Sequence, residues 1–358
     1  MASKQDKQES LPTLVHGAER LPAVDIDAYN AEISDKEGFV GDRASGRAFR
    51  AILEAAREQV RKLDEDPIGD VASSEISKKQ LDRLLVEGDA EAAGLVLGTI
   101  EEFATEFAEV ICQFMRLKAW KGTERVVVGG GLRASRIGEL AIGRTAVLLK
   151  AKEHPVDLVP IRHDPDEAGL IGCIHLAPSW MFSGHDAILA VDIGGANIRV
   201  GIVQLNARKS ADLSKSKVIE SELWRHADDS PDRDGAVEGL VAMLKTMIKR
   251  ANKAKAQLAP FIGIGCPGRI REDGSIEKGS QNLPGDWEHK SFNLPALLRA
   301  AIPEIDGHEM IPLMHNDAVV QGLSEVPFMT DVKQWGVMTI GTGLGNARFT
   351  NRKTGDPE

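Results

Sequence analysis

The stretch VDIGGANIRVGIV, residues 191–203, joins two apolar strands through a tight glycine turn. Asp192 ends the first strand, and Gly194 and Gly195 turn the chain into the second. Glycines let backbone N–H groups approach a phosphate where a Cβ would obstruct them, and a carboxylate beside them can hold Mg²⁺ directly or through water. The hairpin therefore predicts a binding site for a nucleotide's phosphates. The alternative is an ordinary glycine hairpin with a capping Asp.

A second glycine hairpin, IGTGLGNARF, lies at residues 340–349. It also follows an apolar strand, and it places Thr342 between Gly341 and Gly343, with Gly345 beyond them. One glycine turn is a weak indication of phosphate binding, whereas two such turns in one chain indicate a shared ligand. We expect the two hairpins to hold the same phosphates from facing domains.

A third segment, MHNDAVVQG at residues 314–322, brings Asn316 and Asp317 to the expected start of a helix. An Asp at this point can accept the proton of a sugar hydroxyl as the hydroxyl attacks a γ-phosphoryl group. Asn316 offers both a donor and an acceptor to neighbouring hydroxyls. The alternative is a helix N-cap, which Asn and Asp often provide.

Length and composition favour a two-domain protein with large cores, because the 358 residues are 42% hydrophobic and 27% charged. The net charge of -10 argues against a general nucleic-acid binder. No apolar run reaches the roughly 20 residues of a membrane span, and the first dozen residues lack the apolar centre of a secretory signal. We therefore expect a cytoplasmic protein without a membrane partner.

The three cysteines, Cys112, Cys173 and Cys266, are too few and too scattered for a disulfide framework or a Cys-rich zinc site. We expect reduced and mostly buried thiols, and no structural zinc.

Apolar periodicity predicts an alternation of helices and strands after residue 46. Residues 1–45 mix Pro, Asp and Glu with little periodicity, and we expect a mobile tail followed by irregular structure. The predicted helices cover 47–62, 91–117, 135–150, 168–177 and 235–252. The predicted strands cover 125–129, 156–161, 187–191, 197–205, 217–224, 261–265, 336–340 and 346–350.

Together these motifs resemble the ROK family of bacterial glucokinases, related sugar kinases and repressors, within the actin and hexokinase superfamily. The two hairpins are similar to the family's two phosphate motifs, and Asn316-Asp317 is similar to its sugar-binding pair with the catalytic Asp. IGIGCPGRI at 262–270 resembles the family's Gly-x-Pro-Gly segment, and NLPGDW at 282–287 its sugar-proximal segment. The order and spacing match from residue 187 to residue 350.

The family's adenosine motif normally lies downstream of these segments, but here its counterpart lies upstream. RVVVGGGLR at 125–133 resembles the adenosine motif, and PDEAGLIGCIHLA at 165–177 resembles the closing helix that follows it. The resemblance therefore implies a circular permutation, in which residues 178–186 bridge the ancestral ends. Permutation is tolerated where the original termini lie close together on the surface.

The resemblance implies an α/β fold of two actin-like (ribonuclease H-like) lobes with mixed sheets, circularly permuted. One lobe would span 187–325, and the other would combine 46–178 with 326–358, with 179–186 as the linker. The implied activity is phosphorylation of a sugar hydroxyl by ATP and Mg²⁺, with a hexose such as glucose as acceptor. A homodimer is compatible with the family.

The resemblance also assigns roles to individual residues. Asp317 would be the general base, Asp192 the carboxylate on the magnesium side, and Asn282 with Asn316 the residues that orient the sugar. The implied nucleotide-binding residues are Asp192, Gly194, Gly195, Asn197, Arg199, Gly341, Thr342, Gly343, Gly345, Gly129, Gly130 and Gly131.

The sequence departs from the family pattern at three points. Ala196 stands where the first phosphate motif usually has Thr, and neither the Glu-x-Gly-His sugar motif nor the Cys-rich zinc motif is visible. Residues 16–19 read His-Gly-Ala-Glu, the wrong order for the missing sugar motif. These departures favour an alternative, a sugar-sensing or regulatory protein without turnover. No helix-turn-helix with a basic recognition helix precedes the kinase-like region, so we expect no nucleic-acid partner. For His163 and His315 we expect packing, not catalysis.

Overall fold

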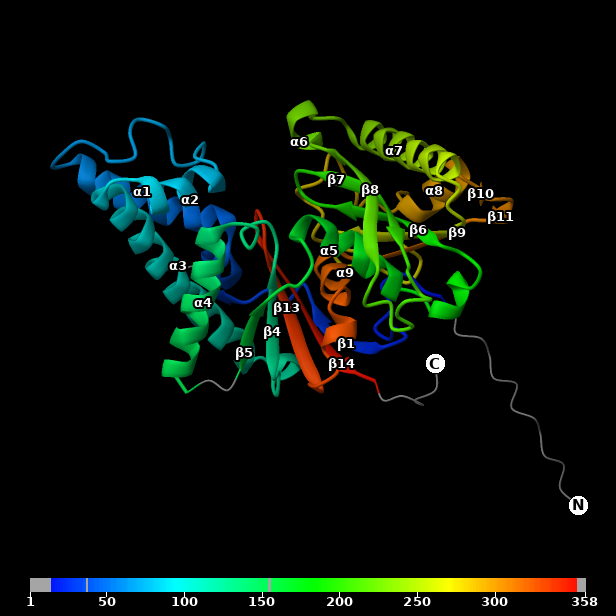
Figure 1. The fold of residues 1–358 in the computed structure, drawn as a ribbon, viewed down its shortest axis with the longest axis horizontal. Helices are drawn as coiled ribbons and strands as arrows, with labels where there is room; N and C mark the ends of the chain where they lie inside the picture. Colours follow the sequence, from blue (N-terminus) through cyan, green and yellow to red (C-terminus); the bar gives the residue numbers. More distant parts are fainter. Residues whose placement is uncertain (1–13, 37, 154–155, 353–358) are drawn as a thin grey trace, which may run out of the picture.

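The computed structural model describes residues 14–36, 38–153 and 156–352, which form two five-stranded sheets covered by helices (Figure 1). This confirms the predicted α/β class with two mixed sheets. In order across the first sheet, the strands are β1 (Val24–Tyr29), β14 (Leu344–Asn351), β13 (Gln334–Ile340), β4 (Arg125–Gly129) and β5 (Asp157–Pro160). Across the second they are β12 (Ile311–Asn316), β9 (Leu258–Cys266), β6 (Ala187–Ile193), β7 (Ile198–Gln204) and β8 (Lys217–Trp224).

The two sheets have the same arrangement of strand directions. In each, a central strand pairs antiparallel with the strand that follows it in the chain, and that strand pairs antiparallel with an edge strand. On the other side of the central strand, two further strands run parallel to it. In the second sheet these five positions follow chain order, whereas in the first sheet the central strand β13 and its partner β14 come last in the chain.

Nine helices surround the sheets in the described residues. They are α1 (Gly46–Arg61), α2 (Lys78–Glu87), α3 (Ala90–Arg116), α4 (Arg136–Ala151), α5 (Pro165–Gly172), α6 (His226–Asp229), α7 (Arg233–Lys253), α8 (Leu294–Ala301) and α9 (Asp317–Leu323). Two small hairpins, β2–β3 (Ser34–Asp35, Gly38–Phe39) and β10–β11 (Glu304–Ile305, His308–Glu309), lie outside the main sheets.

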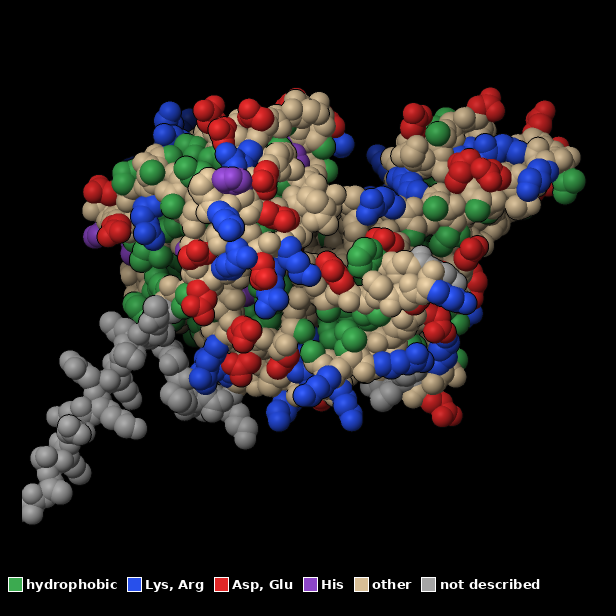
Figure 2. All heavy atoms as spheres, turned by 180° about the vertical axis from the view of Figure 1, so that it is seen from behind, with side chains coloured by type: hydrophobic (Ala, Val, Ile, Leu, Met, Phe, Trp, Pro, Cys, Tyr) green, Lys and Arg blue, Asp and Glu red, His purple; other side chains and the backbone are tan. Residues whose placement is uncertain are grey.

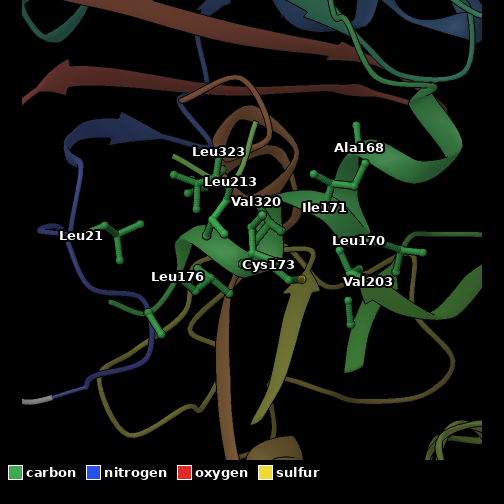
Figure 3. Close-up of a cluster of buried hydrophobic side chains, with 14 of the residues drawn as sticks. Leu21, Ala168, Leu170, Ile171, Cys173, Leu176, Val203, Leu213, Val320 and Leu323 are labelled. Atoms are coloured by element: carbon green, nitrogen blue, oxygen red, sulfur yellow. The ribbon is translucent and has the colours of Figure 1, made fainter. Parts of the chain in front are cut away.

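Helices α5 and α9 lie between the two sheets and join them into one core (Figure 1). Leu170 and Ile171 of α5 and Val320 and Leu323 of α9 belong to a buried cluster that includes side chains from both sheets (Figure 3). Separate clusters lie on the outer faces, between the first sheet and α1, α3 and α4, and between the second sheet and α7 and α8. The molecule therefore has five layers, alternating helices and sheets.

Most predicted elements are present within a few residues of their expected ends. Ser45 caps α1, because its Oγ accepts a hydrogen bond from the Ala48 N–H at 3.1 Å. The predicted helix over 168–177 is shorter, since α5 ends at Gly172 and a 3-10 turn, Cys173–His175, follows. Helix α2 was not predicted; it begins with a capping box formed by Ser77 and Gln80.

The expectation of irregular structure over residues 1–45 is wrong for its second half. Strand β1 pairs with β14 at the edge of the first sheet, with Val24 opposite Asn351. Val24 and Ile26 are buried while Asp25 and Asp27 point outward, so β1 has the period-two pattern of a strand with one covered face. The mobile tail that we expected falls on residues 1–13, outside the described residues.

The three cysteines are buried and unpaired, as predicted. Among the described residues, none of the helices combines the length and the apolar character needed to cross a bilayer.

Candidate active site

Three neighbouring strands of the second sheet end at one edge and bring two acidic residues together. Strands β6 and β12 both run parallel to β9, so Asp192 is level with Gly265 and Asn316 is level with Cys266. Asp317 follows as the first residue of α9. A Cβ added at Gly265 would lie 3.5 Å from Oδ1 of Asp192 and 3.6 Å from Cα of Asp317. The two residues predicted as magnesium-side carboxylate and general base therefore lie on either side of one glycine.

Asp192 occupies a space that a side chain on α5 would fill. A Cβ added at Gly169 would lie 2.7 Å from its Cγ, which is closer than carbon atoms can approach. Arg199 lies 3.9 Å from the Asp192 carboxylate and forms an ion pair at 2.9 Å with Asp166 of α5. Burial raises the pKa of Asp192, the Arg199 charge opposes this rise, and Asp166 adds to it.

The Asp317 carboxyl titrates close to neutral pH. Burial is the main cause, and the charge of Asp192 is the second; together they raise its pKa to about 7. A general base works best when its pKa lies near the working pH, so this environment suits proton exchange with a hydroxyl.

Asn316 is the N-cap of α9, which confirms the alternative interpretation of this residue. Its Oδ1 accepts hydrogen bonds from the N–H groups of Ala318 at 3.0 Å and Val319 at 3.2 Å. Its side-chain nitrogen donates to the Gly268 carbonyl at 3.0 Å, in the Gly-x-Pro-Gly segment. Asn316 thus fixes the start of the helix that carries Asp317.

The turn of the first hairpin is held from two sides. The Gly194 N–H donates to the Asn197 carbonyl at 2.8 Å within the turn, and His226 of α6 donates from Nε2 to the Gly194 carbonyl at 3.0 Å. A Cβ added at Gly195 would lie 3.0 Å from Cβ of Asn282, so the predicted sugar-proximal segment lies against this turn.

The second hairpin lies next to the start of α9. A Cβ added at Gly345 would lie 3.1 Å from Cβ of Ala318, the residue after Asp317. Its turn closes through the Gly341 N–H, which donates to the Gly343 carbonyl at 2.9 Å. The turn is also fixed from α1, because Arg47 donates from Nε to the Thr342 carbonyl at 3.0 Å.

The glycines of the predicted adenosine motif follow β4 and lie beside the second hairpin. Gly130 has a φ of 83°, and a Cβ there would lie 2.5 Å from the backbone N and O of Ile340, the residue before the second turn. Only glycine fits such a close approach in this conformation. Gly129 lies beside Gln321 of α9, and Gly131 lies beside Lys78 of α2.

A cavity of about 510 Å³ begins at Gly131 and extends toward helices α1, α2 and α4. It lies between the starts of α1, α2 and α4 and the second hairpin, and Gly131, Gly341 and Thr342 are among its lining residues. Figure 2 shows a hollow between the two halves of the molecule, with Lys and Arg side chains on the wall toward α1–α4.

Sequence reasoning missed three cations at this cavity, Arg47, Arg50 and Lys78. No motif contains them, and the sequence predicted only a helix over residues 47–62 at the position of α1. The Ser77–Gln80 capping box is the signal that could have placed Lys78 at the start of a helix.

The His-Gly-Ala-Glu segment lies beside β12. The Met314 N–H donates to Nδ1 of His16 at 3.1 Å, and the Gly17 N–H donates to the Met314 carbonyl at 2.9 Å. His315 is buried and bonded to the Ala18 carbonyl at 3.1 Å, and burial lowers its pKa to about 4. These contacts favour the predicted packing role of His315.

The acidic residues suit a magnesium ion that takes most of its ligands from water and phosphate oxygens and only one or two from the protein. Within the described parts of the chain, no group of three or more His, Cys, Asp or Glu side chains could hold a metal ion. Mg²⁺ in phosphoryl-transfer sites is typically held by one or two carboxylates together with water and phosphate oxygens. Asp192, with Asp317 nearby, provides that carboxylate chemistry.

No protein-family model and no curated protein matches the chain. Among solved structures it is similar to a candidate sugar kinase from Cytophaga hutchinsonii, with 20% identity over 48% of this chain and 51% of that chain and a TM-score of 0.34. It is similar to a candidate N-acetylmannosamine kinase from Listeria monocytogenes, with 21% identity over the same shares and a TM-score of 0.34. An exopolyphosphatase from Cytophaga hutchinsonii has 17% identity, shares of 51% and 52%, and a TM-score of 0.22. The chain spans about half the length of the structures it matches, and likeness at this level assigns neither substrate nor activity.

Proposed function

We propose that the chain is an ATP-dependent sugar kinase with two actin-like lobes joined in the reverse of the usual order. One observation carries the proposal: Asp192 and Asp317 lie on either side of Gly265, the first glycine hairpin follows directly on Asp192, and Gly345 of the second lies beside Ala318. This arrangement supports binding of a phosphate donor and a hydroxyl acceptor at one point between the sheets.

The strand order supports the permutation. The second sheet reads in chain order through β6, β7, β8, β9 and β12, and the first sheet has the same pattern if the chain started at β13. The Arg352 N–H donates to the Ala23 carbonyl at 3.0 Å, so the segment that leads into β1 lies beside the segment that leaves β14. This neighbourhood fits β1 as the strand after β14 in the unpermuted order, as β8 follows β7.

In this function Asp317 accepts the proton of the sugar hydroxyl as the hydroxyl attacks the γ-phosphoryl group. The N–H groups of the two glycine turns hold the phosphates. The Asp192 carboxylate would hold Mg²⁺, directly or through water. Mg²⁺, when bound, neutralises developing charge on the phosphate oxygens. Asn282, next to Gly195, orients the acceptor, and Asn316, which fixes the start of α9, positions Asp317. We propose a hexose such as glucose as that acceptor.

The decisive experiment is a coupled ADP-release assay over a panel of sugars, comparing the intact protein with Asp317→Asn. We expect sugar-dependent ADP release that falls about a thousandfold in the variant, because a positioned base contributes about 10²- to 10⁴-fold. Melting temperatures and ATP affinity of the two proteins serve as controls for folding.

One specific observation favours a second function, a sugar sensor without turnover. Ala196 in the first turn provides no hydroxyl, and its carbonyl accepts a hydrogen bond from the Ala227 N–H at 3.2 Å. Sugar binding by the intact protein without any ADP release would favour the sensor and contradict the kinase.

A further inference from the structure

The cavity between α1, α2 and the second hairpin has an unbalanced positive charge. Arg47, Arg50 and Lys78 line it, and no Asp or Glu is among its described lining residues. A larger cavity of about 930 Å³ elsewhere on the molecule is balanced by comparison, since it is lined by Arg20, Arg269, Arg271, Arg352, Glu19, Glu272, Asp273 and Glu277. In a chain of net charge -10, a cavity with cations alone indicates an anionic ligand.

The remainder of the cavity wall is apolar. The side chains concerned are Phe49, Leu81, Leu132, Ile137 and Ile340. A ligand that fills this space therefore combines an apolar, ring-like part with a negatively charged part. A nucleotide has both parts, whereas inorganic phosphate and polyphosphate have only the second.

The cations are held by backbone carbonyl groups, which orient them without neutralising them. Lys78 donates to the Gly131 carbonyl, and Arg50 donates to the Ser73 and Ile76 carbonyls. Within the described residues, no carboxylate lies within 4.0 Å of Lys78 or Arg50. Arg47 has Asp42 at 3.9 Å, and both of those side chains are largely exposed. The positive charge of Lys78 is therefore not compensated by a carboxylate of the described residues and can pair with an anionic ligand in the cavity.

We propose that Lys78 is a phosphate-binding residue of the nucleotide site, with Arg47 as a second cation beside the turn of the second hairpin. The base of a nucleoside triphosphate lies against the apolar wall, and its phosphates pass Lys78 on their way to Gly341 and Thr342. This inference rests on the proposed kinase function and adds to it residues that no motif of the sequence marks.

Calorimetric titration with ATP, ADP and adenosine, using Lys78→Met, tests the role of the charge. Loss of a charge-assisted hydrogen bond weakens binding about 10- to 100-fold, so we expect that loss for ATP and ADP. Adenosine carries no phosphate, and its affinity should be unchanged. Lys79→Met is the matched control, because Lys79 is exposed on the same helix and does not line the cavity. Lys78→Arg should restore most of the ATP affinity.

Other outcomes overturn the inference in distinguishable ways. Equal weakening of ATP and adenosine would mean that Lys78 only supports the Gly131 turn. Unchanged ATP affinity in a Lys78→Met protein with a normal melting temperature would remove Lys78 from the site while leaving the kinase proposal intact. An intact protein that binds neither ATP nor ADP would contradict both proposals. Tripolyphosphate binding as tight as that of ATP would contradict the role of the apolar wall.

Discussion

At the residue scale, two carboxyl groups share a partly buried edge of the second sheet, and the charge of Asp192 affects the ionisation of Asp317. Burial and the negative charge of Asp192 both oppose the ionisation of Asp317 and raise its pKa to about 7. Arg199 lies near Asp192, and its positive charge favours the ionised form of the Asp192 carboxyl group. The environments of two chemically identical groups thus differ, which suits the proposed roles of Asp192 on the magnesium side and Asp317 as proton acceptor.

A pH dependence follows from this pair. Only the ionised form of Asp317 can accept a proton, and its pKa is raised to about 7. The rate at limiting concentrations of both substrates should therefore fall about tenfold per pH unit below that value and level off above it. Initial rates between pH 5 and pH 9, in buffers of constant ionic strength, measure this profile.

Asp192→Asn provides the matched control for that profile. It removes the negative neighbour that raises the pKa of Asp317, so the midpoint of the residual activity should move to lower pH. A midpoint that stays in place or moves upward would show that the titrating group is not Asp317.

At the scale of elements, helices α5 and α9 cross closely between the sheets. A Cβ added at Gly172 of α5 would lie 1.7 Å from the carbonyl oxygen of Val320 in α9. Gly169, one turn earlier, leaves the space that the Asp192 carboxylate occupies. The glycines of α5 thus set both the distance between the helices and the position of the Asp192 side chain.

Gly172→Ala should lower the free energy of unfolding by about 1–3 kcal/mol or more, because the added methyl group forces the two helices apart. Gly143→Ala, in α4, is the control: its added Cβ has no heavy atom within 4 Å. There the change should stabilise the protein by up to about 1 kcal/mol, the helix preference of Ala over Gly. Urea unfolding followed by circular dichroism measures both, and equal effects would contradict the close crossing.

The sequence predicts elements best where the signal is local. Strand β8 has its predicted ends because its alternating pattern is contained within Lys217–Trp224. Strand β1 was missed because its local alternation is short, from Val24 to Asp27, and its partner, β14, lies more than 300 residues away. The candidate site divides in the same way: the glycine turns and Asp317 follow from motifs, whereas Lys78 reaches the cavity only through the packing of α2.

At the scale of the whole molecule, the order of the lobes along the chain is independent of their arrangement in space. The predicted boundaries at 179–186 and 325–326 remain predictions, since α5 packs on the second sheet and α9 packs on both sheets. The structure adds that the two sheets have the same strand order when the first is read from β13. No pattern within one segment of the sequence could indicate this.

Rearranging the chain tests this independence. Joining its two ends and opening new ends at Ser183–Gly184, an exposed part of the connection between α5 and β6, should preserve the fold. We expect an unchanged circular dichroism spectrum and cooperative unfolding. New ends within α9 should abolish folding, because Val319 and Val320 are fully buried there. Failure of the first rearrangement together with success of the second would contradict the proposed permutation.

The pairing of β1 with β14 also has a consequence for biosynthesis. The sheet made by β6 to β12 lies within one continuous stretch, residues 187–316, and can assemble while translation continues. Strands β1, β4 and β5 leave the ribosome much earlier but lack their central strand until Gln334–Ile340 has been made. We expect the nascent chain to expose unpaired strand edges until β13 and β14 have been made, and therefore to depend on chaperones during its own synthesis.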